Sequence, residues 1–135
     1  MENIVTPVSP ERSRRGRLGR IHGQRFELSV REDLNEKGWL VFKNDNQVYL
    51  DENEFKQAKR SFNPFTKMVG YGNGFPDFVC IDIKEFDIKF VESKKNKYLS
   101  QEEKLKVAWI KENLKIPVEV AFNNKDGEIE YVSVG

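Results

Sequence analysis

Two short apolar runs in the middle of the chain constrain its fold more than any other feature. Residues 78–83 are β-branched or otherwise apolar apart from Asp82, and residues 88–94 largely alternate between apolar and polar side chains. Both patterns predict β-strands. Only the segment Lys84-Glu85-Phe86-Asp87 separates them. The two runs are therefore expected to pair as an antiparallel hairpin.

A helix followed by a strand is predicted before this hairpin. Phe26, Val30 and Leu34 lie on one face of a helix expected over residues 24–37. The apolar residues 39–43 then predict a short strand.

A second helix is predicted after the hairpin. Ser100 followed by Glu103 is a capping-box pattern, and the helix is expected to run to about residue 114. Its apolar residues form two stripes, so we expect it to be covered on both sides, by the sheet and by a partner subunit. Two last strands are expected over residues 117–122 and 128–134.

Residues 44–74 form the least regular stretch. Phe55, Ala58 and Phe62 fall at helical spacing, which predicts a short helix near residues 52–62. A loop rich in Gly, Asn and Pro follows it. Loops of this length in small domains more often have a function than none.

The length of the chain bounds its organisation. At 135 residues, 38% of them hydrophobic, the chain can build one core. Residues 21–135 are expected to form a single α/β domain with a mixed sheet flanked by helices. Residues 1–20 carry Pro and Gly among charges, which predicts a basic flexible arm.

Arginine is concentrated near the N-terminus. Between residues 12 and 25 there is no acid, and dense positive charge of this kind can neutralise nucleic-acid phosphates. A solubilising tail fits the same feature equally well. The arginines are Arg12, Arg14, Arg15, Arg17, Arg20 and Arg25.

The counts of cysteine and histidine exclude several kinds of site. Cys80 is the only cysteine and His22 the only histidine, so neither a disulfide nor a Cys/His zinc cluster can form within the chain. Any metal must have oxygen ligands, which favours Mg²⁺ or Mn²⁺. No apolar run approaches the length of a membrane span or signal peptide, so no membrane partner and a cytoplasmic location are expected.

Three charged residues meet at one end of the predicted hairpin. Asp77 precedes the first strand, and Glu92 and Lys94, two residues apart, share one face of the second. Adjacent carboxylates repel each other unless a cation intervenes, and a divalent metal would remove the conflict. The lysine could then orient or deprotonate a water, or stabilise charge on a phosphate. A salt-bridged hairpin end is the alternative.

These residues resemble a known family. Phe75-Pro76-Asp77-Phe78 followed by Glu92-Ser93-Lys94 resembles the motif of the PD-(D/E)XK nuclease superfamily. The predicted order of helix, three strands, helix and strand resembles its restriction-endonuclease-like core (αβββαβ). Archaeal Holliday junction resolvases and virus-type replication-repair (VRR) nuclease domains are the most similar branches. The resemblance covers roughly residues 23–122.

The resemblance implies roles for individual residues. Asp77, Glu92 and the main-chain carbonyl of Ser93 would bind the metal, and Lys94 would be the catalytic lysine. The family usually has an apolar residue where this chain has Ser93, whose side chain is expected to face away from the site. Gln101 matches a polar residue early in the second helix, where a solvated position fits equally well.

Glu27 matches the acidic residue that these nucleases often carry on the first helix. Glu27, Val30 and Leu34 lie at i, i+3 and i+7, so Glu27 borders the buried face, where a carboxylate is costly unless it is paired or binds metal. An ion pair with Arg31, one turn further on, is an equal alternative.

The expected function is that of a Mg²⁺-dependent deoxyribonuclease, an endonuclease whose candidate substrates include branched or junction DNA. A homodimer is expected because such symmetric substrates need two cuts. The alternatives are a non-catalytic DNA-binding or architectural protein with the same fold, and a structural protein whose arm binds RNA or a packaged genome. Basic residues near the site could add phosphate contacts, namely Lys95, Lys97, Lys104 and Lys106.

Overall fold

Five strands form the central sheet of the protein, in the order β1-β6-β7-β8-β9. The computed structural model describes residues 10–71 and 73–135, and within them the side chains of 22–60, 64–67 and 73–135. All neighbouring strands are antiparallel except β7 and β8, so the sheet is mixed, as predicted. The strands are β1 (Leu40–Lys43), β6 (Phe78–Asp82), β7 (Asp87–Ser93), β8 (Val118–Asn123) and β9 (Ile129–Ser133).

The hairpin predicted from the two apolar runs is present as β6 and β7. Phe78 lies opposite Val91, and Asp82 lies opposite Asp87 at the turn. Phe86 adopts a left-handed conformation there, with φ 57°. The pairing brings the beginning of β6 beside the end of β7.

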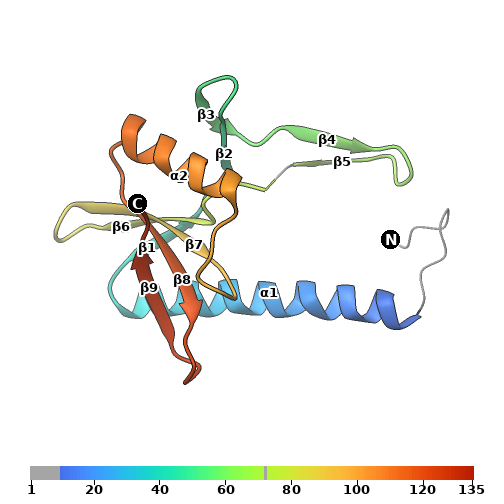
Figure 1. Ribbon diagram of the computed structural model, residues 1–135, viewed down its shortest axis with the longest axis horizontal. Helices are drawn as coiled ribbons and strands as arrows, with labels where there is room; N and C mark the ends of the chain where they lie inside the picture. The colour runs from blue at the N-terminus through green and yellow to red at the C-terminus, as the bar shows by residue number, and fades with distance from the viewer. Residues whose placement is uncertain (1–9, 72) are drawn as a thin grey trace.

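Two helices cover the two faces of the sheet (Figure 1). Helix α1 (Pro10–Glu36) lies on one side, and α2 (Gln101–Asn113) on the other. Because α2 crosses over between β7 and β8, those strands can run parallel. The capping box predicted for α2 is confirmed: Glu103 N donates to Ser100 Oγ (3.1 Å), and Ser100 N donates to Glu103 Oε1 (2.8 Å).

Helix α1 begins well before the start predicted at Gln24. Residues 10–20, expected to be part of a flexible arm, are helical and extend beyond the sheet (Figure 1). Proline at the first helical position needs no hydrogen-bond acceptor. Arginine favours helix, and a helix nucleated by its packed half extends at little further cost. This outweighs the unfavourable contribution of Gly16 and Gly19.

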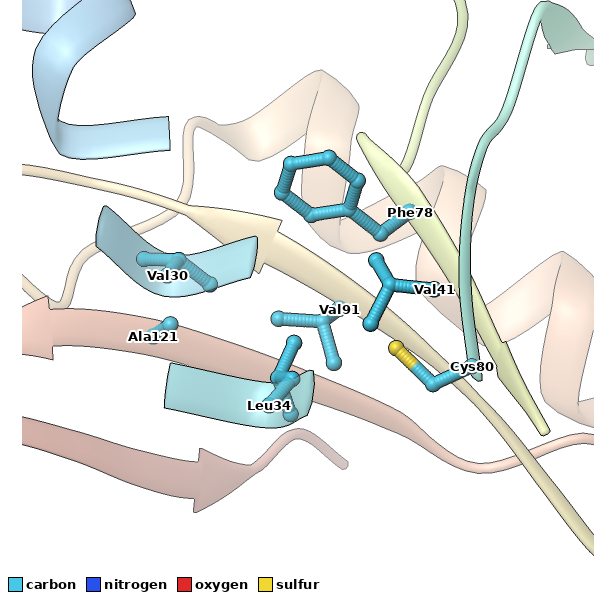
Figure 2. Packing of buried hydrophobic residues seen from close by; sticks show 7 residues of the cluster. All are labelled: Val30, Leu34, Val41, Phe78, Cys80, Val91 and Ala121. Atoms are coloured by element: carbon cyan, nitrogen blue, oxygen red, sulfur yellow. The ribbon is translucent and has the colours of Figure 1, made fainter. Parts of the chain in front are cut away.

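The sheet separates two hydrophobic clusters. The cluster on the α1 side consists of Val30, Leu34, Val41, Phe78, Cys80, Val91 and Ala121 (Figure 2). The cluster on the α2 side consists of Val48, Phe75, Phe90, Val107, Ile110 and Val118. Adjacent residues of β7 therefore point into different clusters, as the alternation of a strand requires.

The short helix predicted near residues 52–62 is wrong. Residues 46–71 form two hairpins: β2 (Asn46–Tyr49) with β3 (Glu54–Gln57), and β4 (Arg60–Asn63) with β5 (Met68–Tyr71). Asn53 turns the chain with φ 56°, and Phe55 then lies opposite Val48, so both pack on the α2-side cluster. This burial outweighs the helical spacing of the aromatic residues.

The β2–β3 hairpin also covers part of α2. Trp109 packs against the α2-side cluster and donates Nε1–H to Asn53 Oδ1 (2.6 Å). The hairpin thus covers part of the stripe for which a partner subunit was expected, while Leu105 and Ala108 stay exposed. Among the described residues, no helix is long and apolar enough to cross a membrane.

Leu34→Ala is expected to lower the free energy of unfolding by about 3 kcal/mol, because it leaves a cavity between α1 and the sheet. Leu34 is 1% exposed. Leu28→Ala on the same helix, at 56% exposure, is the matched control and should change stability little. Urea unfolding followed by circular dichroism measures both. Equal effects would contradict the packing of Leu34 between α1 and the sheet.

Candidate active site

Asp77 and Glu92 come together at one end of the sheet. Asp77 N donates to Glu92 Oε1 (3.0 Å), and Ser93 N donates to Asp77 Oδ2 (2.9 Å). The two carboxylates are therefore held by each other's strand. The structure brings these two residues together, as the hairpin geometry predicts.

The side chain of Ser93 does not face away from the site, so that expectation is wrong. Its hydroxyl donates to Asp77 Oδ2 (2.6 Å), the same oxygen that accepts from its main-chain N–H. The β6–β7 pairing starts with Phe78 opposite Val91, so the N–H of Ser93 lies just past the ladder. No carbonyl of β6 is available to the N–H of Ser93, and the Asp77 carboxylate accepts from it instead. In this position the same carboxylate also accepts from the Ser93 hydroxyl.

Glu92 is a buried carboxyl group, with only 7% of its surface exposed. Burial, the negative charge of Asp77 and that of Glu103 together raise its pKa to about 9, while Lys94 opposes the shift. The nearest lysine nitrogen, Lys94 Nζ, is 3.7 Å from Glu92 Oε2. Glu92 therefore carries a charge only at considerable cost unless another cation is near.

Lys94 is held by the first turn of α2. Its Nζ lies 2.6 Å from Glu103 Oε2, while the other oxygen of Glu103 accepts from the N–H of Ser100. Burial acts against the charged lysine, but the hydrogen bond to Glu103 and the charge of Glu92 outweigh it and raise the pKa of Lys94. The capping box of α2 thus also fixes the position of the ammonium group.

Glu103 holds Lys94 in the site, a role that the sequence does not predict. The sequence identifies Glu103 only as the last residue of the capping box that Ser100 begins. Its position could have indicated the contact, because Glu103 is a carboxylate in the first turn of a helix that begins only a few residues after Lys94. Gln101, the site residue that the family resemblance implies early in this helix, is exposed and lines neither of the two pockets that contain Asp77.

Glu27 faces Asp77 across a pocket of about 510 Å³ between α1 and the sheet end. Glu27 is exposed on α1 rather than buried, but the loss of part of its hydration and the charge of Asp77 raise its pKa, whereas Lys43 lowers it. Arg31, its alternative partner, donates Nη2–H to the carbonyl of Val41 (3.0 Å). The charges that act on the Glu27 carboxylate are therefore those of Asp77 and Lys43, and not that of Arg31.

Asp77 also lines a second pocket, of about 380 Å³, on the α2 side. Glu92, Glu103 and Lys106 line this pocket with it. Asn73 and Gly74 border both pockets. Asp77 therefore lies between two pockets, one lined by residues of α1 and the other by residues of α2.

Asn44 holds the loop that carries Asp77. This buried residue donates Nδ2–H to Pro76 O (2.8 Å), and its main-chain N–H donates to Asp77 O (2.9 Å). A side chain at Gly74 would meet the carbonyl of Asn44, since an added Cβ would lie 1.9 Å from that oxygen. The sequence carried little sign of this clamp, because an Asn after a strand is usually turn material.

The remaining predicted residues lie away from this cluster or outside the described side chains. The side chains of Arg12, Arg14, Arg15, Arg17 and Arg20 belong to the latter group, although their backbone is helical. Arg25 is exposed on α1, and Lys95, Lys97 and Lys104 are exposed around the start of α2. These four could meet a substrate at the surface, but they do not converge on Asp77.

Two findings bear on the identity of this site. Comparisons with protein-family models, with curated proteins and with solved structures found no match. Among the described residues, no group of three or more His, Cys, Asp or Glu side chains is arranged to hold a metal ion. The site therefore has to be interpreted from its own geometry, which offers two close carboxylates and an ammonium.

In metal-free buffer, stability is expected to fall as the pH rises from about 4.5 toward 9. Folding raises the pKa of Glu92 from 4.5 to about 9, so the folded chain binds more protons than the unfolded chain between these values. The stabilisation from protonated Glu92 is full below 4.5 and is lost as the pH approaches 9. Glu92→Gln should remove this slope and be the more stable protein at pH 9, as measured by urea unfolding with a chelator present. Parallel curves for the two proteins would contradict the assigned burial.

Proposed function

We propose that the protein is a metal-dependent nuclease that hydrolyses phosphodiester bonds in DNA. One observation carries the proposal. A carboxylate at the start of β6, a buried carboxylate near the end of β7 and an ammonium two residues further along meet at one end of the sheet. A buried carboxylate beside a second, partly exposed one is costly as structure and is typical of a functional site.

The arrangement of elements supports the same proposal. Helix α1, strands β1, β6 and β7, helix α2 and strand β8 follow one another in the order of the restriction-endonuclease-like core, with the two hairpins of residues 46–71 inserted after β1. The pairing of β7 with β8 is parallel, and helices flank both faces. In this proposal, Asp77, Glu92 and Lys94 would take the motif positions of the PD-(D/E)XK superfamily.

Asp77 and Glu92 fit a hard divalent cation. Their repulsion, expressed in the raised pKa of Glu92, is what such a cation would relieve. Mg²⁺ commonly takes one or two carboxylates and keeps several waters, so a cluster of three acids is not required. Asp77, Glu92 and the main-chain carbonyl of Ser93 are the proposed ligands, with Mn²⁺ a substitute for Mg²⁺. The bound ion would supply a Lewis acid and a water of lowered pKa.

Lys94 is proposed to stabilise negative charge rather than to act as a base. Its contact with Glu103 keeps the amine protonated, since it raises the pKa of Lys94. A protonated amine can donate to a phosphate oxygen as charge develops there. The sequence leaves three roles open to Lys94, namely orienting a water, deprotonating it and stabilising charge on a phosphate, and this environment favours the last.

Basic side chains on both sides of Asp77 support a polyanionic substrate. Arg31 and Lys43 line the pocket on the α1 side, and Lys106 lines the pocket on the α2 side. A strand that passes over Asp77 would place the phosphates on either side of the cleaved bond near these cations. The arginines of α1 would extend this contact, and a cytoplasmic location remains the expectation for such an enzyme.

Purified protein is expected to cleave at least one member of a panel of labelled linear, nicked, flap and four-way DNA when Mg²⁺ or Mn²⁺ is present. Asp77→Asn and Lys94→Ala should each lower the rate by about a hundredfold or more, because the first weakens a proposed metal ligand and the second removes the cation that stabilises charge on the phosphate. Lys84→Ala, at the β6–β7 turn, is the control and should cleave normally.

Two outcomes would contradict the nuclease proposal. One is an absence of cleavage with every substrate and both metals. The other is cleavage that Asp77→Asn leaves unchanged. Tight DNA binding without metal or cleavage would instead support the non-catalytic alternative.

Glu103→Gln is expected to lower kcat about tenfold while KM changes little, because Lys94 loses the carboxylate that positions it. Glutamine still completes a capping box, so helix α2 and the melting temperature should be preserved. Glu102→Gln, on the adjacent exposed position where the carboxylate pairs with Lys106, is the matched control. Equal kcat values for the two variants would show that Glu103 serves only as a cap.

A further inference from the structure

Strand β9 lies at the edge of the sheet, and no other described strand pairs with its outer side. Two main-chain hydrogen bonds fix the alternation along β9: Asn124 N donates to Glu128 O (2.8 Å), and Val134 N donates to Val118 O (3.0 Å). They show that the N–H and C=O groups of the even-numbered residues of β9 point toward β8. By the alternation of an antiparallel ladder, the N–H and C=O groups of the odd residues point outward. These are Ile129, Tyr131 and Ser133, which have no further main-chain partner among the described residues.

A pocket of about 410 Å³ lies beside this edge, between β9 and the face of α2 that carries Lys104, Ala108 and Lys111. Its apolar walls include Leu99, Val107, Val132 and Val134. Val132 is 37% exposed although it sits on a strand, and Tyr98 at the rim is 69% exposed. Open strand and exposed apolar surface are continuous here, which is typical of a protein interface.

Positive and negative side chains lie at opposite ends of this surface. Lys97, Lys104 and Lys111 line the pocket, and none of them takes part in an ion pair between described side chains. Lys111 Nζ instead donates to the carbonyl of Val134 (3.0 Å). Glu130, at the other end of β9, is exposed and has no lysine or arginine partner among the same pairs.

We propose that this surface binds a second copy of the chain, through antiparallel pairing of the two β9 strands about a two-fold axis at Val132. In this register Tyr131 exchanges hydrogen bonds with Ser133 of the second copy, and the two Val132 side chains meet. Glu130 then lies opposite Val134 of the second copy, close to Lys111 of that copy, which donates to the Val134 carbonyl. The two-fold axis produces this pairing of Glu130 with Lys111 twice in the dimer.

Self-complementarity favours a second copy over an unrelated peptide. Ile129 and Tyr131 pack on the α1-side cluster, so Glu130, Val132 and Val134 share the α2 face of β9. A two-fold axis perpendicular to the sheet keeps this face on the same side in both copies. Glu130 of each copy therefore lies near Lys111 of the other, and the two Val132 side chains pack together between these charge pairs. The proposal does not depend on nuclease activity, because the site at Asp77 lies on the other side of α2.

Analytical ultracentrifugation of the full chain, without metal or DNA, tests the dimer. The wild type is expected to dimerise with a Kd in the micromolar range. Glu130→Lys and Lys111→Glu should each weaken dimerisation about tenfold or more, and the double variant should return to within about threefold of the wild type. Glu85→Lys, the same charge change at the β6–β7 turn, is the control and should dimerise normally.

Oxidative cross-linking tests the register. Val132→Cys is expected to form an intermolecular disulfide, because non-hydrogen-bonded partners have Cα atoms about 4.5 Å apart. Glu130→Cys should not, since its counterpart lies further along the strand, and the native Cys80 is buried. A wild type that stays monomeric through the micromolar range, or a dimer that Glu130→Lys leaves intact and Val132→Cys does not cross-link, would overturn the proposal. Binding of an acidic peptide by a monomer would do the same.

Discussion

Strand β7 lies at the centre of the sheet, with Phe90 in one hydrophobic cluster and Val91 in the other. It pairs with β6 on one side and β8 on the other, so its backbone is fixed along its whole length. The meeting of the two carboxylates follows from this constraint. The next residue, Glu92, is carried into the interior because the strand continues, and Asp77 meets it because β6 starts opposite the end of β7.

The electrostatics of the site are unfavourable without a further cation. Glu92 is buried beside Asp77, and the closest ammonium, that of Lys94, lies nearer to Glu103 than to Glu92. A fold selected only for stability would gain by replacing this pair with apolar residues. The arrangement is understandable if the cost is balanced by a bound metal during phosphodiester chemistry, which is the basis of the proposed nuclease function.

Local patterns predicted those parts of the fold whose neighbours in space are also neighbours in the chain. The β6–β7 hairpin and the capping box of Ser100 and Glu103 are examples, because short turns and first-turn contacts are encoded within a few residues. The prediction failed at residues 52–62, where burial of Phe55 against a distant cluster outweighed helical spacing. It also failed for Ser93, whose orientation depends on where the β6 ladder ends.

The sequence by itself determined the order of helices and strands around the hairpin, the absence of cysteine and histidine clusters, and the meeting of Asp77 with Glu92. Only the tertiary structure decided how those acids are held: the clamp of Asn44 on the Pro76 loop and the contact of Lys94 with Glu103. It also decided that β9 is left as an edge. The reason is physical. Strand pairing and periodicity act over a few residues, whereas burial, ion-pair choice and open edges depend on segments that only folding brings together.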